Sequence, residues 1–161
     1  GAGSLHSRSD LTSLRSTKLA AESAFKQANL KITDIDIAEV HDCFTIAELI
    51  AIEDLGFFEK GKAAQAISED RTKINADIPI NSSGGLKSKG HPVGTTGVGQ
   101  IAEIFDQLTD NAGKRQNKNS EIGLTHNVGA TGGSCAVHIF EREWKSRITV
   151  NSRCVSSHKR W

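Results

Sequence analysis

Three stretches of the chain carry apolar residues at intervals of three, four or seven positions, which is the spacing of an amphipathic helix. They cover residues 11–28, 45–55 and 98–108. Asp10 can cap the first helix and Asn29 can end it. Thr45 and Glu48 fit a capping box at the start of the second, and Gly56 stops it. The sequence therefore predicts three main helices.

Strands are predicted where apolar residues alternate with polar ones or form short runs bounded by turn residues. The clearest runs are residues 35–40, 122–126 and 134–140. A glycine-rich turn joins the last two of them, and Ile78 and Ile80 indicate a short extended piece before Gly84 and Gly85. The remaining stretches are read as a weaker helix within residues 57–70 and a solvated connection over 114–120.

Helices that alternate with strands are typical of a layered α/β protein. Because the last two predicted strands need only a tight turn between them, we expect an antiparallel pair within a mixed sheet that has helices on its faces. A strand before residue 10 would improve this thin sheet, but only a short Gly- and Ser-rich stretch stands there. Residues 142–161 show no sustained pattern and are expected to form a basic tail, disordered or foreign to the natural chain, with no role in the chemistry.

Composition excludes several classes of protein. The 161 residues suffice for one domain with a real core, and a formal net charge of +1 gives no general attraction to nucleic acid or to an anionic membrane. No apolar run is long enough to span a bilayer. Three irregularly spaced cysteines fit neither a disulfide framework nor a zinc site, so a reducing, cytoplasmic setting is expected. The absence of methionine indicates a piece cut from something longer.

Three loops place reactive side chains at strand ends, where α/β proteins carry their sites. They read His41-Asp42-Cys43-Phe44, Gly90-His91-Pro92 and His126-Asn127-Val128-Gly129. His91 and Pro92 stand at a glycine-rich helix start, where backbone N–H groups favour negative charge. If the loops meet, the site holds up to three imidazoles, a thiol and backbone donors, a set that suits acyl transfer or carbanion chemistry.

Each of these residues also has a purely structural interpretation. A cysteine that follows a strand, such as Cys43, is more often a small buried hydrophobe than a reactive thiol. Asp42 is expected to bond backbone amides near the following helix rather than to act as a base. Cys135 and His138 lie within a predicted strand and are expected to serve packing. Local sequence alone therefore leaves the chemistry open.

Taken together, the three loops resemble those of the carboxyl-terminal half of a thiolase, in the archaeal and sterol-carrier-protein-type branch. The form of residues 41–44 is the hallmark of that branch, and residues 90–97 match the Gly-His-Pro loop of the family. The resemblance implies a thiolase-like βαβαββ layered half over residues 1–141 that lacks its first strand. It also implies a coenzyme A thioester as substrate, no metal or redox cofactor, and a homo-oligomer.

The resemblance assigns roles to individual residues. His91 would activate the nucleophilic cysteine and help to bind the thioester oxygen, and His41 would stand beside that oxyanion site. Cys43 would be the acid/base that removes or returns the proton at the α-carbon. The further oxyanion and substrate-binding residues that it implies are His126, Asn127, Gly129 and Gly90.

The nucleophile of the family lies in a Cys-x-Ser-type loop of the amino-terminal half, and none of Cys43, Cys135 and Cys154 stands in such a loop. The chain is therefore expected to be an inactive fragment, or one subunit of a split enzyme, that needs the amino-terminal thiolase half as a partner. Two alternatives stay open. One is a thiolase-like aldolase, which cleaves a carbon–carbon bond without an acyl-cysteine, and the other is a non-catalytic assembly module that binds a partner through apolar surface.

Overall fold

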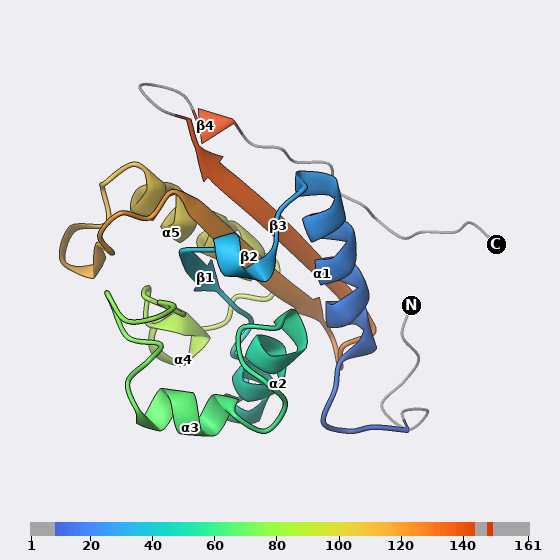
Figure 1. Cartoon of the computed structure of the whole chain (residues 1–161). Helices are drawn as coiled ribbons and strands as arrows, with labels where there is room; N and C mark the ends of the chain where they lie inside the picture. The colour runs from blue at the N-terminus through green and yellow to red at the C-terminus, as the bar shows by residue number, and fades with distance from the viewer. Residues whose placement is uncertain (1–8, 144–147, 150–161) are drawn as a thin grey trace.

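The computed structural model describes residues 9–143 and 148–149, and these residues form a mixed sheet with the strand order β1-β2-β3-β4 (Figure 1). The strands are β1 (Ile37–Glu39), β2 (Ile122–Gly129), β3 (Ser134–Arg142) and β4 (Ile148–Thr149). β1 runs parallel to β2, whereas β2 and β3 form an antiparallel hairpin. Ile80 adds a single parallel bridge to Ala38, as expected for a short extended piece.

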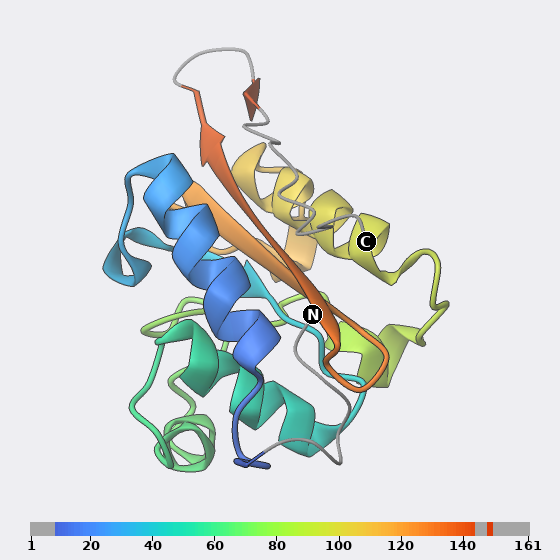
Figure 2. The ribbon, with the colours of Figure 1, turned by 90° about the vertical axis from the view of Figure 1, so that its right-hand side faces the viewer.

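Two long helices cover opposite faces of the sheet (Figure 2), namely α1 (Arg15–Ala28) and α5 (Thr96–Leu108). The shorter helices lie below the sheet in Figure 1 and are α2 (Thr45–Leu55), α3 (Ala63–Ser68) and α4 (Gly85–Lys89). The described residues also contain two 3-10 helices, Ile32–Asp34 and Gly113–Arg115. The predicted α/β class, a mixed sheet with helices on its faces, is confirmed. Within the described ranges no helix is long and apolar enough to cross a bilayer.

The core lies on both sides of the sheet, because β1 is covered on both faces. Ala38 and Leu124 pack in the larger cluster with residues of α1 and α2, whereas Ile37 packs on the opposite side with Ile104 and Leu108 of α5. Every residue of β1 is buried, including Glu39. The alternation in residues 35–40 predicts a strand here, which β1 confirms, and α5 covers its second face.

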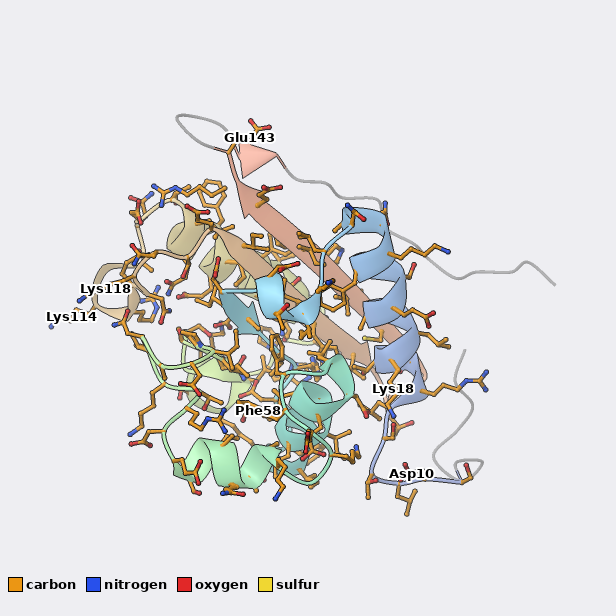
Figure 3. All side chains as sticks on the ribbon, viewed as in Figure 1. Asp10, Lys18, Phe58, Lys114, Lys118 and Glu143 are labelled. Atoms are coloured by element: carbon orange, nitrogen blue, oxygen red, sulfur yellow. The ribbon has the colours of Figure 1, made fainter. Side chains whose placement is uncertain are left out.

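The predicted helix starts are wrong, since the expected local caps do not form. Asp10 accepts hydrogen bonds from the amide and hydroxyl of Thr12, so α1 begins only at Arg15. The Asp54 carboxylate of α2 accepts the Leu14 amide at that start. Figure 3 shows Asp10 below α1 and apart from it.

The start of α2 differs from its prediction as well. Phe44 is the N-cap residue and makes no side-chain cap, so Thr45 and Glu48 do not form a capping box. Instead the Glu48 carboxylate accepts a hydrogen bond from the side chain of Asn81. The predicted helix ends are confirmed, because Asn29 and Gly56 adopt the left-handed conformation with φ of 55° and 96°.

Several connections depart from the sequence-based interpretation. The short helix α4 lies in the glycine-rich loop, and Pro92 stands in a turn before α5 rather than in its first turn. Lys114 and Lys118 project into solvent (Figure 3), which agrees with the solvated connection predicted for residues 114–120. Asn117 between them is nevertheless buried, and its side chain donates a hydrogen bond to Gln107 of α5. Within the predicted tail, β4 pairs with the end of β3, and the other residues beyond 143 lie outside the described ranges.

Helix α5 buries an unexpected face. Its predicted apolar stripe splits, because Ile104 and Leu108 are buried whereas Val98 and Phe105 are exposed. The buried face is completed by polar side chains that reach backbone groups, such as Gln100, which donates to the carbonyl of His126 at 3.0 Å. Among residues 9–143 and 148–149, nothing covers the apolar side chains of Val98 and Phe105 on α5 fully.

Gly123→Ala is expected to destabilise the chain by about 1–3 kcal/mol, because overpacking strains a well-packed core. A Cβ at Gly123 would lie 2.5 Å from Cγ2 of Ile104, inside the buried contact between β2 and α5. Gly99→Ala is the matched control, since a Cβ there meets nothing within 4 Å, and it should stabilise α5 by about 0.5–1 kcal/mol. Urea unfolding of both variants measures the two effects, and a neutral Gly123→Ala would contradict this packing.

Candidate active site

The reactive residues gather where β1 and β2 end. Because these strands are parallel, their carboxyl ends lie at the same edge of the sheet, and His41 and Cys43 stand in the loop after β1. The rings of His41 and His91 meet edge to face, with centroids 5.0 Å apart and planes at 83°. The amide of His41 donates to Nδ1 of His126 on β2 at 3.4 Å. The structure therefore brings the three predicted loops together.

His41 is buried, with 5 % of its surface exposed. Burial lowers the pKa of its imidazole, and the neighbouring His91 lowers it further. Its Nδ1 has no hydrogen-bond partner among the described residues. A neutral imidazole in this position can exchange a hydrogen bond with a bound ligand.

His126 is fully buried within the strand itself, since β2 continues to Gly129 and does not end at residue 126 as predicted. Burial lowers the pKa of its imidazole to about 3, with a smaller contribution from His41, so the ring is neutral at pH 7. Because Nδ1 accepts the His41 amide, Nε2 carries the proton and donates to the hydroxyl of Thr17 at 2.9 Å. The ring thus fixes the backbone of His41, and its contact with a substrate stays a prediction.

His91 stands on an exposed loop between α4 and α5, after Gly90, whose φ of 87° favours glycine. Its Nδ1 lies 2.7 Å from the hydroxyl of Thr96, the first residue of α5. Pro92 accepts two backbone hydrogen bonds, from the amides of Thr95 and Thr96, and so shapes the loop. The side chain of His91 is consequently held at one ring nitrogen.

Asp42 holds α4 in place. Its Oδ1 accepts the amide of Leu86 at 2.8 Å, and a Cβ on Gly85 would lie only 2.1 Å from Oδ2. Gly85 also has a φ of 64°, so the close approach and the backbone conformation both require glycine. Asp42 therefore bonds backbone amides, as its structural interpretation predicts, although the helix is α4 rather than α2.

Sequence reasoning missed Glu39, which ties the loop before His91 to β1. Its buried carboxylate accepts the amide of Ser83 at 3.1 Å and the hydroxyl of Ser83 at 2.6 Å, with Lys89 Nζ 3.5 Å away. Burial raises the pKa of this carboxyl group despite those partners. A charged residue two positions before His41 was the available signal, but an alternating strand pattern does not show which of its polar residues are buried.

Asn127 and Gly129 lie farther along β2. The side-chain Nδ2 of Asn127 donates to Oε1 of Gln100 at 3.2 Å, and a Cβ on Gly97 would lie 3.1 Å from the same Nδ2. A cavity of about 320 Å³ opens beside them and is lined by residues of α5, β2 and β3. Gly129 is paired with Ser134 at the end of the hairpin. The substrate contacts of Asn127 and Gly129 stay predictions.

Fold and sequence together define a domain of the thiolase class. Residues 2–142 match the family described as thiolase C-terminal domain-like, and the chain belongs to that family. It is 54 % identical over 142 residues to an acetyl-CoA acetyltransferase of Methanothermobacter thermautotrophicus, covering 88 % of this chain and 37 % of that protein. It is 45 % identical over 124 residues to sterol carrier protein 2 of Gallus gallus, covering 77 % of this chain and 22 % of that protein.

The solved structures agree on the fold. A chain of the Ltp2-ChsH2(DUF35) aldolase superimposes with a TM-score of 0.75 at 24 % identity, covering 88 % of this chain and 35 % of that one. The peroxisomal 3-ketoacyl-CoA thiolase of Saccharomyces cerevisiae is built from two core domains of identical topology. It superimposes with a TM-score of 0.51 at 26 % identity, covering 79 % of this chain and 29 % of that one. This chain thus spans between about a fifth and little more than a third of the length of these relatives.

Proposed function

We propose that this chain is the acid/base half of a thiolase that acts on acetyl-CoA and 3-ketoacyl-CoA thioesters. One observation carries the proposal, namely the edge-to-face contact of His41 and His91 at the strand ends that Cys43 follows. Two imidazoles side by side can hold the oxygen of a thioester as it gains negative charge. A thiol on the same loop can then exchange a proton with the carbon next to that carbonyl.

In this proposal the resemblance to thiolases supplies the roles of the residues. His91 takes the proton of the nucleophilic cysteine and, with His41, binds the oxygen of the enolate. Cys43 removes the α-proton in condensation and returns it in thiolysis. The Nδ1 of His41, buried and unpartnered among the described residues, supports a hydrogen bond to substrate or to a water molecule at this point.

The acyl-enzyme requires a cysteine from elsewhere. Burial raises the pKa of the Cys135 thiol to about 11, which leaves almost none of it as the nucleophilic thiolate at pH 7. We therefore infer an amino-terminal thiolase half as the partner that supplies the nucleophile. Val98 and Phe105 of α5, which are 64 % and 51 % exposed, support such a partner.

Reconstitution tests this proposal. The chain alone, incubated with acetyl-CoA and free coenzyme A, should give no acetoacetyl-CoA and no thiolysis. Addition of a separately produced amino-terminal thiolase half from an archaeal relative should restore turnover, because the nucleophile and the acid/base then share one site. Turnover by the chain alone, or carbon–carbon cleavage without a trappable acyl-cysteine in the mixture, would contradict the proposal.

A further inference from the structure

We infer that Thr96 is a positioning residue that selects the ring tautomer of His91. The Thr96 side chain is buried, with the residue 4 % exposed, at the start of α5. Its Oγ1 lies 2.7 Å from Nδ1 of His91 and 3.2 Å from the carbonyl oxygen of Pro92. A neutral imidazole has one N–H and one bare nitrogen, so the single hydroxyl proton of Thr96 decides which nitrogen is bare.

Two arrangements of these protons are possible. If the Thr96 hydroxyl donates to Nδ1 of His91, it has no proton left for the Pro92 carbonyl, and only one hydrogen bond is made. If Nδ1–H donates to Oγ1, the hydroxyl is free to donate to the Pro92 carbonyl, and two hydrogen bonds are made. The second arrangement is favoured because it satisfies both groups, and it leaves the lone pair on Nε2 of His91.

This tautomer has a chemical consequence. A ring whose Nε2 is bare can take a proton from a thiol and then donate it, whereas the other tautomer presents an N–H that cannot act as a base. The catalytic meaning of the inference rests on the proposed function. The tautomer itself does not, since it can be measured on this chain without substrate.

The test is a long-range ¹H–¹⁵N correlation spectrum of the histidine rings in this ¹⁵N-labelled chain, recorded at a pH where His91 is neutral. The wild type should show the protonated nitrogen of His91 at Nδ1. Thr96→Val should shift the tautomer ratio towards Nε2–H by about threefold to tenfold, the equivalent of one hydrogen bond. Thr96→Ser keeps the hydroxyl and should retain the wild-type ratio.

His126 provides an internal control in the same spectra, because its bonds to His41 and Thr17 require an Nε2–H tautomer in any folded variant. Thr96→Ala also lacks the hydroxyl, so a folding failure of Thr96→Val alone leaves the comparison intact. An Nε2–H form of His91 in the wild type would overturn the inference, as would an unchanged ratio in a folded variant without the hydroxyl. Either result would leave the reconstitution experiment unaffected.

Discussion

His126→Leu is expected to lower the free energy of unfolding of this chain by about 2–6 kcal/mol at pH 7. Leucine fills a similar volume but cannot bond the hydroxyl of Thr17 or the amide of His41, both of which lie in buried residues. Each buried polar group left without a partner costs about 1–3 kcal/mol. Urea denaturation measures the loss, and His138→Leu, which removes a half-buried ring from β3, is the control with a smaller effect.

The pH dependence of stability distinguishes this burial from a simple packing loss. The folded-state pKa of His126 is about 3 against an ordinary value of 6.5, so the unfolded chain binds the proton more tightly. The stability that the neutral His126 ring contributes is therefore fully present above pH 6.5 and is lost as the pH falls towards 3. Between pH 5.5 and 4 the wild type should lose about 1.4 kcal/mol per pH unit more than His126→Leu. Parallel curves for the two proteins would contradict a buried neutral ring.

Periodicity predicted much of the fold because it records which residues meet the sheet. The three main helices and the β2–β3 hairpin were predicted from apolar spacing, and Asn29 and Gly56 were recognised as helix ends from their backbone preferences. Helix starts were not predictable in the same way. The Asp54 carboxylate holds the residue before α1, Leu14, from 40 residues along the chain, and a local rule cannot weigh a partner so far away.

In the candidate site, too, local features were predictable from the sequence, whereas contacts with distant residues were not. The sequence placed reactive residues at strand ends, and parallel pairing of β1 with β2 brought His41 and His126 to one edge. It could not show that His126 points inward, or that Glu39 is buried, because both depend on helices that cover the two faces of the sheet. Buried polar residues are placed by their tertiary partners, which the alternation of a strand does not contain.

Cys43→Ala, in this chain reconstituted with the amino-terminal half, is expected to reduce the exchange of α-protons of acetyl-CoA by about 10²–10⁴-fold, the usual worth of a general acid/base. Acyl transfer to the nucleophilic cysteine should persist, because His91 is intact and serves that step. Cys135→Ala is the matched control, since that thiol lies on β3 and burial raises its pKa. It should leave both steps near their wild-type rates.

The most direct measurement of the central claim, that Cys43 and His91 act on one acyl group, is deuterium uptake at the α-carbon of acetyl-CoA in D₂O, followed by mass spectrometry beside acyl-cysteine formation. The account predicts rapid uptake with the wild type and with Cys135→Ala. For Cys43→Ala it predicts a normal acyl-cysteine with almost no uptake. Wild-type uptake by Cys43→Ala would show that another group moves the proton and would contradict the account.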